Sequence, residues 1–229
     1  MKLSAVVMSY NEEKTIRDVV EKLYRVLSEI SEEFEIIIVD DGSNDNSRNI
    51  IKELLNDKIR AIFHHKNLGI GEVLRSGYFN AKYEYVFIVP ADGQFDTNEL
   101  YLIKVIPEKT FISFYRENLR NYGIFRKFLT FYNNVIINRI ILRIKTKDVN
   151  WVKVFPTNMI KKLNLKLRSS LIQTEICAKL ERIGYKPIEI PSKYLPRKEG
   201  KSKTNFKIII KAFIESFKLI YEVLRFKLK

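Results

Sequence analysis

The sequence has very few of the residues that most often bind metals or form cross-links, with one cysteine and two histidines among 229 residues. The single cysteine, Cys177, excludes a disulfide within the chain and a cysteine-based metal cluster. His64 and His65 are adjacent, a spacing that cannot place both side chains on one face of a strand, so we assign them no catalytic role. Met1 and Lys2 lead directly into a strand-length apolar run, so we expect no signal peptide.

Acidic residues are fewer than basic ones. The chain has 27 Asp and Glu and 41 Lys and Arg, which gives a formal net charge of +14. So basic a protein first suggests a nucleic-acid partner. Most of the acids, however, lie in the amino-terminal half, and the cations gather later, in a region that is also rich in Ile, Phe and Leu. We therefore expect an anionic membrane surface as the partner and no nucleic acid. The length and the 46% hydrophobic content fit a globular fold.

Strand-length apolar runs alternate with segments of helical periodicity in the first part of the chain. The predicted strands are 3–9, 35–39, 59–63 and 85–89, and the predicted helices are 11–29, 46–55 and 71–81. This alternation predicts an α/β fold of the doubly wound, Rossmann-like kind, with a mostly parallel sheet and helices on both faces. The loops that follow the strands should then share one crevice at the carboxyl edge of the sheet.

Those loops carry polar side chains suited to chemistry. They are Ser9 to Glu13, Asp40 to Asp45, Asn67 to Gly71 and Asp92 to Gln94. Each loop alone could be a turn or a helix cap, but carboxylates in three of them indicate that a cation or sugar hydroxyls bind at this edge. A hard cation that already binds a diphosphate needs only one or two protein oxygens, such as those of Asp92 and Gln94. The sequence therefore indicates an enzyme that acts on a nucleotide diphosphate.

The successive motifs resemble those of one known family. They are Ser9-Tyr10-Asn11-Glu12, Val39 to Asp45, Asn67-Leu68-Gly69, Asp92-Gly93-Gln94, Gln173-Thr174-Glu175 and Arg197-x-x-Gly200-x-Ser202-Lys203. In this order they look like the motifs of family 2 glycosyltransferases with the GT-A fold, and most resemble those of the dolichyl-phosphate or polyprenyl-phosphate sugar synthases. The resemblance implies an inverting, metal-dependent transfer of a sugar from a nucleotide diphosphate, of the GDP-mannose or UDP-glucose type, to a lipid phosphate.

The resemblance also implies contacts to the donor and the metal. The matching donor positions are Ser9, Tyr10, Asn11, Glu12, Asp40, Asp41, Gly69, Asp92 and Gln94. Of these, Asp92 and Gln94 look like ligands of Mg2+ or Mn2+. Pro90 replaces the first acid of the family's Asp-x-Asp-x-Gln pattern. The loss of a carboxylate should weaken metal binding in the absence of donor, because charge and ligand number set the affinity for hard cations.

In the resembling synthases, cationic residues bind the lipid phosphate or the departing diphosphate. The matching acceptor-phosphate positions are Arg116, Arg126, Thr130, Arg197 and Ser202, and the positions expected to act in catalysis are Asp92, Arg197, Lys203 and Glu175. A phosphate acceptor is already an anion near neutral pH and needs no strong base, so Glu175 is expected to have a positioning role. The segment from Asp148 to Lys153 keeps the family's aspartate but lacks its glycine, and Trp151 within it is interpreted as a core residue.

Two other functions stay open on the sequence alone. The acceptor could be a hydroxyl of a protein, glycan or glycolipid, in which case Glu175 or a nearby carboxylate would act as the base. The departures at Pro90 and in the Asp148 segment also allow a non-catalytic, nucleotide-sugar-binding membrane subunit.

The chain divides into a predicted GT-A domain, 1–204, and a terminal segment, 205–229. Within the domain, 1–110 should bind the nucleotide sugar and 111–204 the acceptor, and 191–204 is predicted to be a loop that orders on substrate. The terminal segment predicts an amphipathic helix, too often interrupted by charge to span a bilayer, that docks on an anionic membrane or a partner subunit. A predicted helix at 123–144 has a similar pattern, and core packing explains it as well. We expect a peripheral protein on the cytoplasmic face of the cell membrane.

Overall fold

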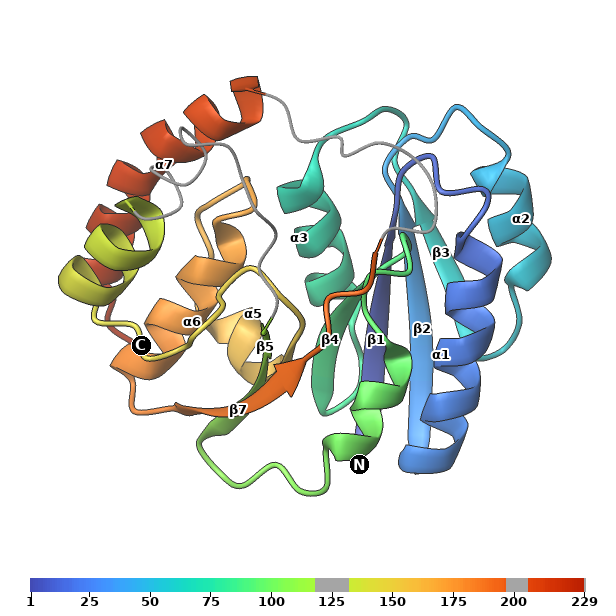
Figure 1. Ribbon diagram of the computed structural model, residues 1–229, viewed down its shortest axis with the longest axis horizontal. Helices are drawn as coiled ribbons and strands as arrows, with labels where there is room; N and C mark the ends of the chain where they lie inside the picture. Colours follow the sequence, from blue (N-terminus) through green and yellow to red (C-terminus); the bar gives the residue numbers. More distant parts are fainter. Residues whose placement is uncertain (118–131, 197–205, 229) are drawn as a thin grey trace.

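A computed structural model describes residues 1–117, 132–196 and 206–228. Its centre is a seven-stranded sheet in the order β3-β2-β1-β4-β6-β5-β7 (Figure 1). The strands are β1 (Lys2–Ser9), β2 (Glu33–Asp40), β3 (Ile59–Phe63), β4 (Tyr85–Pro90), β5 (Thr110–Arg116), β6 (Lys153–Pro156) and β7 (Lys186–Ser192). Neighbouring strands are parallel except where β6 pairs with β4 and β5. The predicted α/β fold with a mostly parallel sheet is confirmed.

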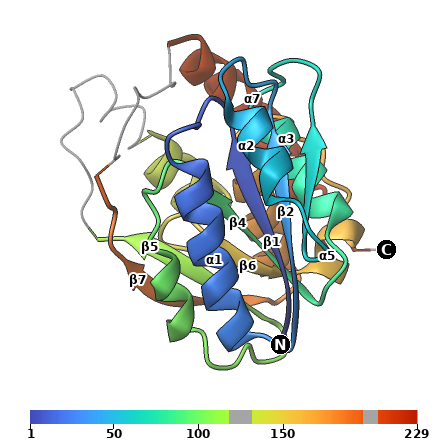
Figure 2. The ribbon, with the colours of Figure 1, turned by 90° about the vertical axis from the view of Figure 1, so that its right-hand side faces the viewer.

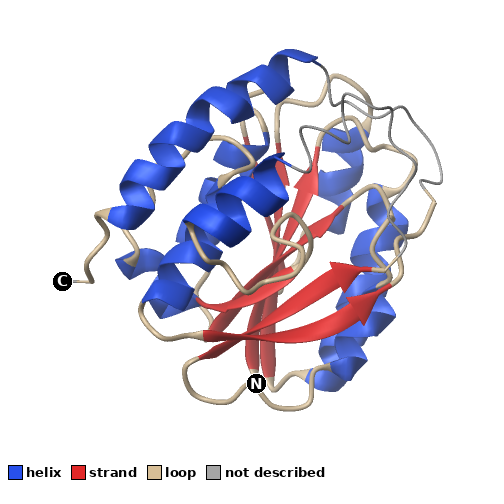
Figure 3. Cartoon of the chain, turned by 60° about the vertical axis from the view of Figure 1, so that its left-hand side comes forward, coloured by secondary structure: helices blue, strands red, loops and turns tan. Residues whose placement is uncertain are grey.

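Helices cover both faces of the sheet (Figure 3). They are α1 (Ile16–Ile30), α2 (Ser47–Leu54), α3 (Ile70–Asn80), η1 (Thr97–Leu102), η2 (Tyr132–Ile141), α5 (Thr157–Lys162), α6 (Ile172–Arg182) and α7 (Phe206–Leu224). One core joins the sheet to α1, α2 and η1, and η1 lies beside α1 (Figure 2). The second core joins the opposite face to α3, α5, α6, η2 and α7. Because both faces are buried, the central strands are apolar at nearly every position.

The second core is close-packed where α3 crosses β1. A Cβ atom at Gly77 of α3 would lie 2.2 Å from Cγ1 of Val6, which is fully buried in β1. Only a residue without a side chain lets the helix approach the strand this closely, and a glycine at this position therefore sets the distance between the two elements.

Three element boundaries differ from the sequence prediction. The first helix starts at Ile16 and not near Asn11, because Asn11 has a φ of 53° and its side chain bonds to a neighbouring loop. The predicted helix 123–144 corresponds to η2, which ends at Ile141. The helix cannot continue to residue 144, because Arg143 has a φ of 55°. Residues 118–131 lie outside the described residues. Pro191 and Ser192, predicted to begin a loop, continue β7.

The predicted terminal helix is present as α7, which packs against α6 and η2 (Figure 1). Leu219 and Val223 of α7 are buried in that contact, so the helix is part of the fold rather than a separate appendage. Within the described ranges, every helix falls short of the length and hydropathy that a membrane crossing needs.

Candidate active site

The loops at the carboxyl ends of β1, β2 and β4 lie side by side, as the strand pattern predicted. Ser9 at the end of β1 is in register with Asp40 at the end of β2, and Met8 is in register with Pro90 of β4. The chain stays paired past the strand ends, because the Asp41 amide donates to the Ser9 carbonyl at 2.9 Å and the Ala91 amide donates to the Met8 carbonyl at 3.0 Å. The polar loops are therefore held at one edge by the sheet itself.

Two buried polar atoms at this edge have no hydrogen-bond partner among the described residues. They are Oγ of Ser9 and Oδ1 of Asp40, on adjacent strand ends. The other carboxylate oxygen of Asp40 accepts hydrogen bonds from Nε of Arg48 at 2.8 Å and from the Ser43 amide at 3.2 Å. A buried polar atom without a partner costs about 1–3 kcal/mol, so a pair of them at a strand edge indicates a place where a ligand supplies the missing bonds.

Asp41 supports the loop that precedes α3. Its carboxylate accepts hydrogen bonds from the amides of Leu68 and Gly69, at 2.9 Å and 2.8 Å, and contacts Nδ1 of His64 at 2.8 Å. Gly69 has a φ of 90°, which favours glycine at this turn. Nε2 of His64 in turn lies 2.9 Å from Oγ of Ser76. Asp41, expected to contact the donor, thus supports the 68–69 loop, and His64 links Asp41 to Ser76 of α3.

The loop after β1 is joined to the loop after β2. The Asn11 amide donates to Oγ of Ser43 at 2.9 Å, the Asn44 amide donates to Oδ1 of Asn11 at 2.8 Å, and the Glu12 amide donates to Oγ of Ser47 at 2.9 Å. Asn11 is therefore a structural link between the loops. Tyr10 and Glu12 are partly exposed beside Ser9, as a donor contact requires.

The candidate metal ligands follow β4. Asp92 is partly exposed, and its Oδ1 accepts a hydrogen bond from the Gln94 amide at 3.1 Å. Gln94 is tied to the segment before residue 197, because its carbonyl accepts from the Leu195 amide at 3.0 Å and its Nε2 donates to the Leu195 carbonyl at 3.4 Å.

A carboxylate and a carboxamide are hard oxygen donors that fit Mg2+ or Mn2+ when a diphosphate completes the coordination. In the part of the chain that the structure describes, no group of three or more His, Cys, Asp or Glu side chains could hold a metal ion. The donor set at Asp92 and Gln94 thus fits a metal that a ligand's phosphates help to hold.

Arg116, predicted to bind the acceptor phosphate, is held on three sides. Its Nε and Nη2 donate to the carboxylate of Asp148 at 2.7 Å and 3.1 Å. Its guanidinium lies over the rings of Trp151 and Tyr194, at 5.0 Å and 5.5 Å from the ring centroids. Burial raises the pKa of Asp148, but the hydrogen bonds and charge of Arg116 outweigh burial and the pKa lies below its ordinary value.

Comparison with known proteins identifies the family of the region that contains these strand ends. Residues 4–109 match the profile of Glycosyl transferase family 2. This part of the chain belongs to that family. The match covers β1 to the end of η1 and the loops that follow it, which includes each candidate donor and metal position described above.

Two curated relatives illustrate the similarity. The undecaprenyl-phosphate 4-deoxy-4-formamido-L-arabinose transferase of Proteus mirabilis is 31% identical over 102 residues, which is 43% of this chain and 31% of that protein. The human dolichyl-phosphate beta-glucosyltransferase is 34% identical over 100 residues, which is 40% of this chain and 31% of that protein. The aligned region thus spans about a third of the length of these relatives.

Solved structures show the same fold over nearly the whole chain. The glucosyl-3-phosphoglycerate synthase of Mycobacterium tuberculosis, in complex with Mn2+, UDP and glucosyl-3-phosphoglycerate, has a TM-score of 0.66 at 13% identity, covering 97% of this chain and 78% of that one. TarS 1–349 of S. aureus, in complex with UDP-GlcNAc, has a TM-score of 0.58 at 18% identity, covering 100% of this chain and 68% of that one. The family 2 region and the remaining strands therefore form one GT-A-like fold.

Glu175 does not take part in the strand-end contacts of this family 2 fold. It is fully buried in α6, where its carboxylate accepts from the Lys166 and Leu167 amides, both at 2.9 Å, and from Nζ of Lys179 at 2.6 Å. The expected positioning of a substrate by Glu175 finds no support in these contacts, which stabilise the interior.

Five other predicted positions lie outside the described residues. They are Arg126, Thr130, Arg197, Ser202 and Lys203. The chain leading to the last three is nevertheless placed, because Tyr194 pairs with Phe95 and Leu195 pairs with Gln94. The last described residues before this motif therefore lie beside the β4 loop.

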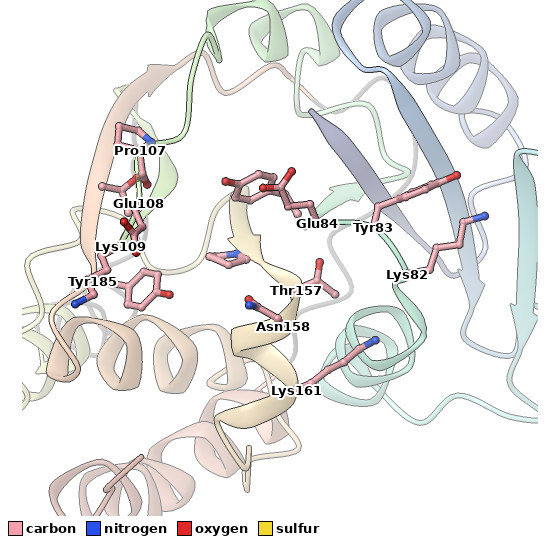
Figure 4. Close-up of a pocket in the computed structure, with 13 residues that line it drawn as sticks. Lys82, Tyr83, Glu84, Pro107, Glu108, Lys109, Thr157, Asn158, Lys161 and Tyr185 are labelled. Carbon is pink, nitrogen blue, oxygen red and sulfur yellow. Dashed lines mark hydrogen bonds between the residues drawn. The ribbon is translucent and has the colours of Figure 1, made fainter. Parts of the chain in front are cut away.

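A separate cavity of about 540 Å³ lies at the opposite edge of the family 2 sheet (Figure 4). Its walls come from residues where β4 and β5 begin, such as Tyr85 and Thr110, and from Thr157 of α5. The length of β4 separates this cavity from Pro90, a distance of about 17 Å at 3.3 Å per residue. No predicted site residue lines it, so we place the site at the strand ends.

Sequence reasoning missed three residues that shape this site. Arg48 holds Asp40, His64 holds Asp41, and Tyr194 covers Arg116. Tyr194 lies far along the chain from Arg116, and Arg48, although only eight residues after Asp40, carries no local signal of its contact. His64 could have been recognised as a strand-end residue that follows β3, beside the carboxylates at the end of β2.

Proposed function

We propose that the protein transfers a sugar from a nucleoside diphosphate to a polyprenyl or dolichyl phosphate at a membrane surface. The observation that carries the proposal is the pair of buried, unpartnered atoms, Oγ of Ser9 and Oδ1 of Asp40, at adjacent strand ends of a family 2 region. The names of the Proteus mirabilis and human relatives support a lipid phosphate acceptor. The UDP complexes of the structural neighbours support a nucleotide donor in this fold.

The bonds of Asp40 favour uracil over guanine as the base. Uracil presents one ring N–H between two carbonyls, whereas guanine presents a ring N–H and an amino group side by side, which a carboxylate accepts best with both oxygens. One oxygen of Asp40 already accepts from Arg48 and Ser43, which leaves Oδ1 as the acceptor. Because Asp40 has no exposed surface, base binding includes a shift of the atoms that cover it.

A divalent metal would be held by Asp92, Gln94 and the donor's diphosphate. When bound, it would neutralise the negative charge that develops on the departing diphosphate. Of these two side chains, only Asp92 carries a charge. Gln94 also joins the β4 loop to Leu195 through hydrogen bonds. The two side chains therefore have different tasks, one electrostatic and one partly structural.

The acceptor phosphate would meet Arg116. Arginine suits phosphate because its planar fork matches two oxygens, and the packing of Arg116 against Trp151 and Tyr194 restricts its orientation. A lipid phosphate can attack without a base, whereas a hydroxyl needs one. The hydrogen bonds of Glu175 to interior groups disfavour it as the base for a hydroxyl, and so support a phosphate acceptor.

The exposed face of α7 supports docking on a lipid surface. Ile214, Phe217, Tyr221 and Leu224 of this helix are 48–63% exposed, although Leu219 and Val223 on its other side are buried in the protein. Exposed lysines and arginines, including Arg225 and Lys227, accompany this apolar face. Each cation near an anionic surface contributes roughly 1 kcal/mol, and inserted apolar side chains add to it.

A donor panel tests the proposed transfer. Purified full-length protein is incubated with vesicles that contain undecaprenyl phosphate and with radiolabelled UDP-sugars or GDP-sugars, in Mn2+ or Mg2+, and label in the organic phase is counted. We expect transfer from at least one UDP-sugar, and loss of transfer on chelation of the metal. Transfer from GDP-sugars alone would overturn the base assignment, and absence of transfer from every donor would overturn the function.

A substitution pair tests the docking surface without removing α7. Phe217→Glu places a charge on the exposed face of α7, and Leu102→Glu does the same at a 54% exposed position on η1. We expect Phe217→Glu to reduce sedimentation with anionic vesicles and Leu102→Glu to leave it unchanged. Equal sedimentation of the two variants would contradict docking through α7.

A further inference from the structure

Lys153 is a buried cation without a carboxylate partner. It is the first residue of β6 and is 1% exposed. Its Nζ donates to the backbone carbonyls of Asp148, of Trp151 at 3.1 Å and of Phe114 at 3.3 Å, and has a longer contact of 3.5 Å with the carbonyl of Val152. Among the described residues, no carboxylate lies within ion-pair distance of this ammonium group.

Such a group is costly for the fold. Burial of an ammonium group removes its hydration, and an unpaired one is among the least favourable groups in a protein interior. Burial accordingly lowers the pKa of Lys153 below its ordinary value. An apolar side chain of similar length would fill the same space without this cost, so the ammonium group is expected to do something that packing alone does not.

The three carbonyls identify that task, because each belongs to a segment that places Arg116. Phe114 precedes Arg116 by two residues in β5. Asp148 supplies the carboxylate that binds the guanidinium, and Trp151 supplies one of the rings over which it lies. The three N–H groups of one ammonium therefore join the strand that carries Arg116 to the two residues that orient it.

We propose that Lys153 is a positioning residue that fixes the guanidinium of Arg116 toward the acceptor phosphate. It acts through backbone carbonyls and touches neither substrate, and the proposal rests on the proposed function for its kinetic consequence. Without Lys153, three carbonyls lose their common donor, and the 148–151 segment can move relative to β5. A misplacement of about 1 Å at a reacting group can cost on the order of 100-fold in rate.

A matched pair of substitutions tests this inference. Lys153→Met keeps the length of the side chain and removes the charge. Lys179→Met does the same at the other fully buried lysine, whose Nζ donates to the carbonyls of Leu163 and Asn164 and to Glu175. Both variants leave backbone carbonyls without a donor, and Lys179→Met also leaves the Glu175 carboxylate without its cation. We expect only Lys153→Met to lower kcat/KM for undecaprenyl phosphate, by about 10- to 100-fold, with the Kd for UDP and Mn2+ little changed.

A spectroscopic measurement makes the test independent of catalysis. The Nε–Hε resonance of Arg116 is assigned by its loss in Arg116→Lys, and its shift is then recorded in both lysine variants. Lys153→Met should move the resonance and Lys179→Met should not. If Lys153→Met does not fold, Lys153→Gln, which keeps an N–H donor, is measured in its place and should show a smaller shift and a smaller rate loss.

The outcomes separate the two proposals. If the wild type transfers no sugar to the lipid phosphate, the proposed function fails while the Arg116 resonance still tests the positioning. An unchanged Arg116 resonance in Lys153→Met, or equal losses of nucleotide affinity and transfer rate, would overturn the role of Lys153.

Discussion

The Asp148–Arg116 ion pair should make a measurable contribution to the free energy of unfolding. The side chains are only 14% and 17% exposed, and the guanidinium meets the carboxylate through two hydrogen bonds. Asp148→Asn keeps the shape of the side chain but leaves a mostly buried guanidinium without its counter-ion. Breaking a buried pair from one side costs about 3 kcal/mol. In a chain of this size that loss lowers Tm by about 6–12 °C.

The pH dependence of this loss follows from the pKa of Asp148. Burial raises this pKa, but the hydrogen bonds and charge of Arg116 outweigh burial, so the folded pKa lies below the unfolded value. A carboxyl group with a depressed folded pKa adds stability above its unfolded pKa, about 3.9, and that stability is lost as the pH falls through the folded pKa. The difference between the wild type and Asp148→Asn should therefore be full at neutral pH and shrink in acid.

Urea unfolding followed by circular dichroism, at pH 7 and at successive values below pH 4, measures this difference. Asp18→Asn is the control, because Asp18 pairs with Lys22 on the exposed side of α1 and its loss should cost less than about 0.5 kcal/mol. A cost for Asp148→Asn as small as that of the control at pH 7 would refute the reasoning. A difference that persists unchanged below the folded pKa would refute the assignment to charge.

The remaining predictions concern three other sites. Asp92→Asn should abolish transfer in Mn2+ or Mg2+ and leave the unfolding curve unchanged. Gln94→Ala should reduce the transfer rate less, because water can replace a neutral ligand. Near-normal rates in Asp92→Asn would contradict the metal site. Gly77→Ala should lower the unfolding free energy by about 1–3 kcal/mol, because the clash with Val6 outweighs a helix-propensity gain of about 1 kcal/mol. A variant as stable as the wild type in urea would contradict the close packing. Burial raises the pKa of Cys177 to about 12, so the folded thiol stays neutral at a pH where the unfolded thiol ionises. Stability relative to Cys177→Ala should therefore fall by about 2 kcal/mol from pH 8 to pH 10, and parallel pH profiles of the two proteins would argue against it.

The sequence predicts the amino-terminal half of the fold well because its strands are buried on both faces. Segments such as 36–39 and 85–89 are apolar throughout, and the polar loops that follow them mark the carboxyl edge of a parallel sheet. The convergence of Ser9, Asp40 and Asp92 follows from that pattern alone. The family resemblance then assigned chemistry to an edge that the periodicity had already located.

The second half is less predictable because tertiary pairing decides it. β6 has four residues and pairs antiparallel between two strands that are parallel to each other, an arrangement that no local pattern specifies. The individual contacts are equally non-local. Glu175 matched a motif, yet the amides of residues 166–167 and Lys179 take its carboxylate into the interior. The ammonium group of Lys153 would be assigned to the surface from composition, and only the fold shows the three carbonyls that bind it.

The nature of the acceptor is the most direct test of the central claim. Full-length protein is given one radiolabelled UDP-sugar and Mn2+ with two sets of vesicles, which contain either undecaprenyl phosphate or undecaprenol and are otherwise identical. If Arg116 receives a phosphate and the transfer uses no base, label should enter the organic phase with the phosphate lipid and stay in the aqueous phase with the alcohol. Equal transfer to the alcohol would show that a hydroxyl is activated at this site, and would contradict the account.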